Sequence, residues 1–217
     1  MKIIEIGGND FEAREGTALW SSVTEKNFYI LKNKFASSFL KPNFEILNRF
    51  PVAKEFEIEK VIRLKTSILD DQKIEGDFII LDTQGSELEI LKGAEKTLTH
   101  IKGLKIETHF IPLYEGMPLF GELHQFLFER GFYLHEMQRC YWKENLNSPI
   151  RRGKLVWADC IYWRDEAVKM SGRNPISYKG RGSGKIQKVL RYINDFFAYY
   201  PNNGQLQDIE IKNPYID

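Results

Sequence analysis

A chain of 217 residues, 42% of them hydrophobic, is long enough for one α/β domain with its own core, or for a domain with an appendage. Its 31 basic and 30 acidic residues nearly cancel, which argues against nucleic acid and membrane surfaces as partners. Two widely spaced cysteines, no leader-like N-terminus and no apolar stretch of membrane-spanning length predict a cytoplasmic protein in a reducing compartment.

The first half of the chain contains three strand-like runs. Residues 28–31 and 56–64 carry β-type side chains, and the second run alternates imperfectly, which is typical of a half-buried strand. Residues 78–81 are continuously apolar, as expected of a strand covered on both faces. This last run is followed by Asp82, so we expect a carboxylate at the end of a buried strand.

A helix is predicted directly after that strand. Ser86 and Glu89 match the capping-box pattern at a helix N-terminus. The buried stripe of this helix is predicted at Leu88, Leu91, Ala94 and Leu98.

Residues 104–110 predict the next strand and complete a βαβ unit. The two strands of such a unit are parallel and end at the same edge of the sheet, where α/β sheets bind ligands. We therefore expect Asp82 to meet Glu107 or His109 in one crevice.

The rest of this region predicts a helix at about 118–130 and an antiparallel pair of strands at 132–135 and 155–163. The polar, basic stretch 138–153 is expected to be a loop near the sheet edge. Residues 1–165 are thus predicted to form one α/β domain.

Composition changes after this domain. Residues 166–185 are rich in Gly, Ser and basic side chains and predict a flexible basic linker. Residues 186–217 predict an amphipathic helix at 186–200 and a tail, a C-terminal helical extension of the fold. Such a helix must pack on the domain or on a partner chain, and the second arrangement would make an oligomer.

Four segments carry more specific patterns. Residues 78–94 contain a strand, an Asp-x-x-Gly-x-Glu turn and a Leu-Lys-Gly-Ala helix; residues 106–120 contain a strand and a Pro-Leu-Tyr-x-Gly-x-Pro-Leu-Phe loop. Residues 36–43 include Ser-Ser-x-x-x-Pro-Asn, and residues 153–159 read Gly-x-Leu-x-Trp-x-Asp. In order and spacing, these segments resemble the FkbM-type family of S-adenosylmethionine-dependent methyltransferases across residues 28–165.

This resemblance implies a Rossmann-like methyltransferase sheet with S-adenosylmethionine as the cofactor. The implied reaction is methylation of a hydroxyl, with a sugar or another small metabolite as the acceptor. Most of the catalysis would then come from holding the acceptor in line with the methyl group.

The N-terminus departs from the family pattern. Residues 3–10 resemble the Gly-rich first-strand motif, but Phe11 stands where glycine is usual, and only about thirty residues separate this motif from Ser37. Either the N-terminal half is severely shortened, or the Gly7-Gly8 turn is coincidental and the usual half is absent. We favour the second interpretation and expect a sheet that is incomplete at its N-terminal side.

The resemblance and the strand positions together give a set of site residues. Asp82 is the first candidate for orienting the acceptor or the cofactor. Glu107 and His109 share a strand face, and His109 is the candidate base because an imidazole titrates near working pH. No metal is expected, since the spacing matches none of the known ligand motifs. The expected cofactor contacts are Ser37, Ser38, Asp82 and Gln84.

Other interpretations stay open. His109 could simply bond within the sheet, and the serines could serve as turn donors. The chain could be a non-catalytic remnant or interaction module that keeps half of the fold. It could also be a metal-dependent nucleotide-sugar transferase that uses Asp82, although no DxD-type pair follows the strand.

Overall fold

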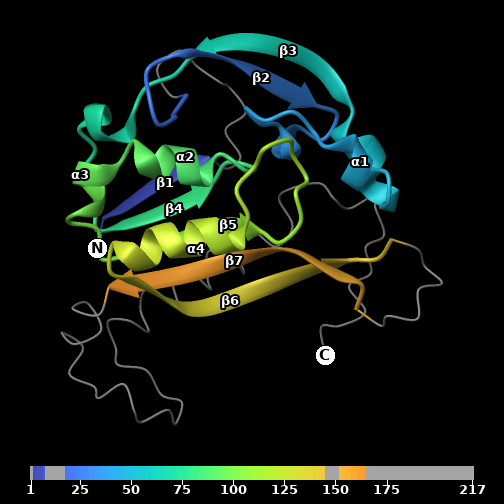
Figure 1. Cartoon of the computed structure of the whole chain (residues 1–217). Helices are drawn as coiled ribbons and strands as arrows, with labels where there is room; N and C mark the ends of the chain where they lie inside the picture. The colour runs from blue at the N-terminus through green and yellow to red at the C-terminus, as the bar shows by residue number, and fades with distance from the viewer. Residues whose placement is uncertain (1, 8–17, 145–151, 165–217) are drawn as a thin grey trace. The chain divides into compact units, whose positions relative to one another are not determined.

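The computed structural model describes residues 2–7, 18–144 and 152–164 (Figure 1). Within these ranges the strands form a five-stranded sheet, in the order β1-β4-β5-β7-β6, and a separate antiparallel pair of β2 and β3. The strands are β1 (Ile3–Gly7), β2 (Glu25–Leu31), β3 (Ile58–Lys65), β4 (Phe78–Asp82), β5 (Gly103–His109), β6 (Phe132–Trp142) and β7 (Lys154–Arg164).

The larger sheet is mixed, which confirms the predicted α/β class. Strands β1, β4 and β5 run parallel, whereas β5, β7 and β6 pair antiparallel. The apolar residues 78–81 of β4 are all buried, because the strand lies inside the sheet and is covered on both faces. The loop predicted at 138–153 is wrong in its first part: Gln138 to Trp142 continue β6 and pair with β7.

Two short helices replace the single helix predicted after β4. They are α2 (Glu87–Lys92) and α3 (Glu95–Leu98), and the predicted stripe of both is buried. The break falls at Gly93, where a Cβ atom would lie 2.5 Å from the carbonyl oxygen of Trp20. A neighbouring segment therefore packs directly on the backbone between the helices.

The helix predicted at about 118–130 is α4 (Phe120–Glu129). Its buried side, Leu123 and Leu127, joins the same core as Leu104 of β5 and Phe132 of β6. Gly131 ends it with φ +77°, the left-handed conformation that favours glycine after a helix.

The β2–β3 pair exposes more apolar surface than the larger sheet does. The half-buried strand expected at 56–64 is wrong in its burial, since only Leu64 of β3 is buried and Val61 is 47% exposed. A sheet of only two strands has little structure packed against it, so one of its faces stays exposed to solvent. Short helical turns connect the two strands and follow the second: η1 (Lys34–Ala36), α1 (Phe44–Leu47) and η2 (Pro51–Phe56), then η3 (Leu69–Gln72).

A second core fixes the base of this pair above the carboxyl edge of the sheet. Leu31 at the end of β2 and Phe56 before β3 pack with Tyr114 and Met117 from the loop after β5. Figure 1 shows β2 and β3 at the top of the view, with α2 and the sheet beneath them. The fold thus brings residues near 36–40 to the ends of β4 and β5.

Some predictions lie outside the described residues. The linker at 166–185, the helix at 186–200 and the rest of the Gly-rich segment after Gly7 belong to this group. Among the helices that the structure describes, none is long and apolar enough to cross a membrane.

Candidate active site

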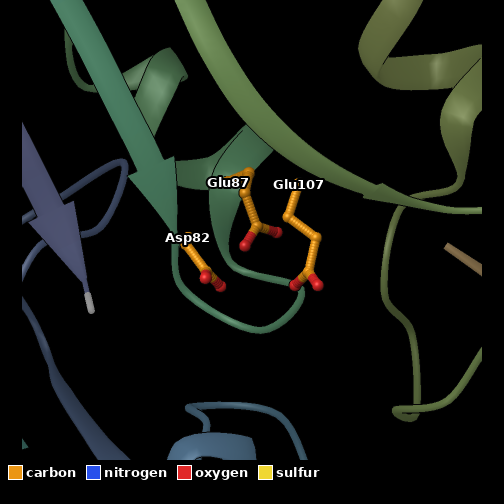
Figure 2. Close-up of side chains that lie close together, drawn as sticks. All are labelled: Asp82, Glu87 and Glu107. Atoms are coloured by element: carbon orange, nitrogen blue, oxygen red, sulfur yellow. The ribbon is translucent and has the colours of Figure 1, made fainter. Parts of the chain in front are cut away.

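The carboxyl ends of β1, β4 and β5 meet at one edge of the sheet. Gly7 pairs with Asp82, and Leu81 pairs with Ile106, so Asp82 and Glu107 project from neighbouring strands. As predicted, the structure brings these two acids together. Figure 2 shows Asp82 at the end of β4 and Glu107 on β5, with Glu87 between the two strands. Carboxylate oxygens of the three acids lie within 4.8 Å of one another.

The third acid, Glu87, was not a predicted site residue. It is buried, and its carboxylate accepts hydrogen bonds from the backbone N–H of Thr83 at 2.7 Å and of Gly85 at 2.9 Å. The Thr83 hydroxyl adds a bond of 3.1 Å. Glu87 therefore closes the turn between β4 and α2.

The predicted capping box at this turn is wrong. The Ser86 side chain makes no capping bond, and its buried hydroxyl has no partner among the described residues. Glu89 instead accepts a hydrogen bond from Ser21 at 2.6 Å and pairs with Lys92 at 2.5 Å. Glu87 takes the role of satisfying free N–H groups before the helix.

Gln84 lies at the centre of the acidic group. Its side-chain Nε2 donates to Oδ1 of Asp82 at 2.9 Å and to Oε2 of Glu107 at 2.8 Å. Its Oε1 accepts from the Tyr114 hydroxyl at 3.2 Å. The three acids could each offer an oxygen to a metal ion, and the Gln84 amide nitrogen bonds two of them.

Burial shifts the pKa values of Glu87 and Glu107. Burial, reinforced by the charges of Asp82, Glu87 and Asp159, raises the pKa of Glu107 well above its ordinary value. Burial also raises the pKa of Glu87 to about 7, although the backbone donors of its turn oppose that rise. Both glutamates therefore hold a proton more tightly than an exposed glutamate does.

His109 lies on the same face of β5 as Glu107, as predicted, but it is buried. Its ring stands edge-on to Tyr114, with 6.4 Å between ring centroids. Burial lowers the pKa of His109 to about 3, so the imidazole is neutral across the physiological range. The reason given for His109 as a base, titration near working pH, is therefore wrong.

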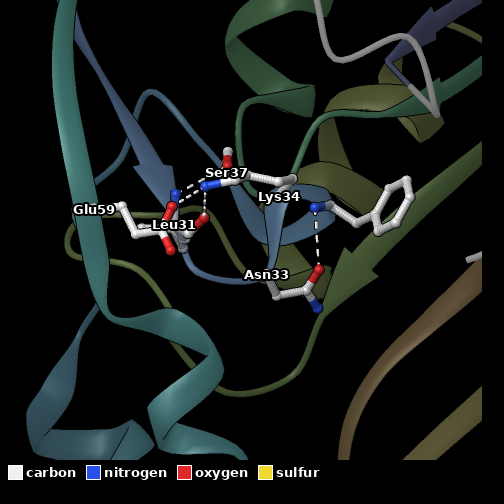
Figure 3. A network of polar contacts seen from close by, with 6 residues as sticks. Leu31, Asn33, Lys34, Ser37 and Glu59 are labelled. Carbon is white, nitrogen blue, oxygen red and sulfur yellow. Dashed lines mark hydrogen bonds and ion pairs between the residues drawn. The ribbon is translucent and has the colours of Figure 1, made fainter. Parts of the chain in front are cut away.

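The hydroxyl of Ser37 makes a local hydrogen bond at the end of β2. It accepts the Leu31 N–H at 3.0 Å, and Lys34 donates to the Leu31 carbonyl at 3.1 Å while pairing with Glu59 of β3. Figure 3 shows this network, in which Asn33 also caps the turn. It fixes the chain where it leaves β2.

Ser38 links that turn to the acidic group. Its hydroxyl donates to the Gln84 carbonyl at 2.7 Å and accepts the Leu40 N–H at 3.0 Å, and the side chain is fully buried. Of the two predicted serines, Ser38 thus contacts the turn that carries Gln84, whereas the bond of Ser37 stabilises the turn after β2.

Strand β1 shows a feature that the sequence signalled only weakly. Gly7, at its end, has φ +88°, and a Cβ atom there would collide with the Asp82 carbonyl oxygen. Only glycine allows the two strand ends to approach this closely. Residues 3–7, the first part of the N-terminal match, thus form a strand of the sheet beside Asp82.

Comparison with known proteins agrees with this geometry. A family model described as "Methyltransferase FkbM domain" matches residues 20–134, which is just over half of the chain and includes Asp82, Gln84, Glu87 and Glu107. No match was found among curated proteins or among solved structures. The chain therefore belongs to the FkbM methyltransferase family and is an S-adenosylmethionine-dependent methyltransferase.

Proposed function

We propose that this chain methylates a hydroxyl of a sugar or another small metabolite at the edge formed by β1, β4 and β5. The observation that carries this proposal is the position of Asp82. It is a partly exposed carboxylate at the end of a buried parallel strand, beside an obligatory glycine on the neighbouring strand. Ligands of open α/β sheets bind outside such strand ends.

The residues at this edge fit the cofactor. S-adenosylmethionine, when bound, supplies a methyl group on a positively charged sulfonium. The Asp82 carboxylate would favour that charge. The missing side chain of Gly7 lets the end of β1 lie directly against the Asp82 carbonyl, which places a second strand end at the proposed site. We further propose that β1 is the first strand of the methyltransferase sheet, and that the N-terminal half is shortened rather than absent.

Within the proposed site, Asp82 would take the proton of the acceptor hydroxyl as its oxygen becomes methylated. Burial raises the pKa of Glu107, which favours its uncharged form, and we assign the role of base to Asp82. His109 and the two serines would support the wall of the site instead of taking part in proton transfer. In-line displacement requires the acceptor oxygen to face the methyl group, so the main task of the site would be to hold the acceptor in that orientation.

Binding of S-adenosylmethionine, which carries the sulfonium charge, tests this proposal when measured by isothermal titration calorimetry. We expect saturable binding to the wild-type chain that is lost in Asp82→Ala. Asp77→Ala is the matched control, because Asp77 precedes the same strand at the opposite edge of the sheet. Wild-type protein that binds no ligand at millimolar concentration would overturn the proposal, as would equal affinities of the two variants.

A further inference from the structure

Gln84 connects four separate segments of the fold. Its amide nitrogen bonds Asp82 on β4 and Glu107 on β5, and its amide oxygen accepts from Tyr114 in the loop after β5. Its backbone carbonyl accepts from Ser38, in the segment after β2. All four of these partners border the site.

The backbone of Gln84 is held in an unusual conformation. Its φ is +55°, and Lys73 is the only other non-glycine residue with a positive φ in the described ranges. Glu87 fixes the turn on both sides by accepting the N–H groups of Thr83 and Gly85. Strained conformations of this kind persist where the surrounding structure determines them, and they concentrate at functional sites.

The side chain at this position needs an amide. Only Asn and Gln combine two N–H donors with an oxygen acceptor, and Gln has the longer reach. A carboxylate here would add another acid to Asp82, Glu87 and Glu107, and an apolar side chain would leave buried oxygens unpaired. The single hydrogen of the Tyr114 hydroxyl is shared between the Ala36 carbonyl at 2.7 Å and the Gln84 amide oxygen at 3.2 Å, and the shorter bond is the one to Ala36.

We propose that Gln84 is a positioning residue. Its amide holds Asp82 and Glu107 in one arrangement and connects that arrangement to Ser38 and Tyr114. This inference rests on the proposed function and differs from the cofactor contact that the family resemblance implies for Gln84. Asp82 meets the ligand, and Gln84 acts through Asp82 and Glu107.

A reciprocal exchange tests the proposal. Gln84→Glu places a carboxylate against two acids, Glu107→Gln removes one, and the double variant restores one amide and one carboxyl across the same gap. We measure melting temperature and S-adenosylhomocysteine affinity for wild type and these three variants between pH 5 and pH 8. Gln125→Glu is the matched control, because Gln125 also donates to a carboxylate, Glu129, but on the exposed side of α4.

At pH 8 we expect Gln84→Glu to bind S-adenosylhomocysteine about tenfold more weakly, or worse, and to melt earlier than wild type. Both losses should shrink towards pH 5, where the introduced carboxyl group is protonated and can donate again. The double variant should recover most of the affinity at pH 8. The titratable groups that face this position are Asp82, Glu87, Glu107, Tyr114 and, behind Glu107, Asp159.

Several results would overturn the inference. One is a Gln84→Glu affinity profile parallel to wild type across this pH range; another is a double variant whose loss equals the sum of the single losses. Failure of Gln84→Glu to fold even at pH 5 would also contradict it. If wild type bound no S-adenosylhomocysteine, the proposed function would fail instead, and the melting temperatures of the cycle alone would decide whether Gln84 couples the acids.

Discussion

Acidic residues lie near both ends of the parallel strands β1, β4 and β5. The partners and the pKa values of these acids differ between the two edges of the sheet. At the amino edge, Asp77 precedes β4 and pairs with Lys102, which precedes β5. It also accepts the backbone N–H of Lys2 at 2.9 Å, before β1. The hydrogen bond from Lys102 and that from Lys2 keep the pKa of Asp77 below its ordinary value.

At the carboxyl edge, the corresponding places hold Asp82, Glu107 and Gly7. Here an acid faces an acid, and burial raises the pKa of Glu107 instead of lowering it. Opposite charges at the amino edge add stability, whereas like charges at the carboxyl edge reduce it. Raised pKa values of buried acids are common at functional sites, and this contrast supports the proposal that the site lies at the carboxyl edge.

The largest expected effect is at Gly7. Gly7→Ala forces a Cβ atom against the Asp82 carbonyl and imposes a φ that alanine disfavours. We expect the free energy of unfolding to fall by roughly 2–4 kcal/mol. Urea unfolding followed by circular dichroism measures this. Gly121→Ala is the control, since nothing lies within 4 Å of its added Cβ atom in α4; equal stability of the two variants would contradict the close contact.

The next effect concerns pH. The pKa of Glu87 is about 7 in the folded chain, above its ordinary 4.5, so the folded state binds this proton more tightly and stability falls as pH rises between these values. Titration of Glu87 should lower the free energy of unfolding by on the order of 3 kcal/mol across this range. Glu87→Gln cannot titrate, and its free energy of unfolding should depend less steeply on pH from 4.5 to 7.

Unfolding at intervals across that range checks this expectation. Glu89→Gln is a suitable comparison, because hydrogen bonds from Lys92 and Ser21 lower the pKa of Glu89 despite its partial burial. Its curve should keep the wild-type slope above pH 4.5. A Glu87→Gln curve parallel to wild type would show that the carboxyl edge carries no such penalty.

A smaller effect separates charge from hydrogen bonding at Glu107. Glu107→Gln resembles the protonated acid, and we expect its stability at pH 7 to stay within about 1 kcal/mol of wild type. Glu107→Leu leaves the Gln84 amide without this acceptor and should cost about 1–3 kcal/mol. Equal stabilities of the Gln and Leu variants would mean that the bridge contributes nothing.

The smallest effect is expected at the amino edge. Asp77→Asn removes an exposed ion pair and should lower the free energy of unfolding by less than about 1 kcal/mol, with little difference left in about 1 M salt. Because the pKa of Asp77 is lowered on folding, its contribution is present above pH 3.8 and lost as pH falls through the folded value. Unfolding in low and high salt measures it, and a salt-independent loss would contradict the surface origin.

Much of the carboxyl edge could be predicted from local sequence. The apolar run 78–81 and the helical stripe after it define a βαβ unit, and parallel strands necessarily end together. The meeting of Asp82 with Glu107 follows from that rule alone. The helix predicted at about 118–130 was likewise found, as α4, and Gly131 follows it in the left-handed conformation.

What local sequence could not give depends on contacts between distant segments. Glu87 matched the acidic residue of a first helical turn, and only the folded turn shows its bonds to Thr83 and Gly85. Strand alternation placed His109 on the right face but said nothing about its burial. Gly7 was a weak signal because the group that requires a glycine there, the Asp82 carbonyl, lies on another strand.

The pairing of β1 with β4 has a consequence for the order in which the chain folds. Ile3 pairs with Phe78, so β1 has no hydrogen-bonding partner in the sheet until the whole β2–β3 region has been synthesised. Closing so long a loop costs entropy that only the finished β4–β5 pair can offset. The amides of β1 should therefore be among the last in the sheet to gain protection from hydrogen exchange during refolding.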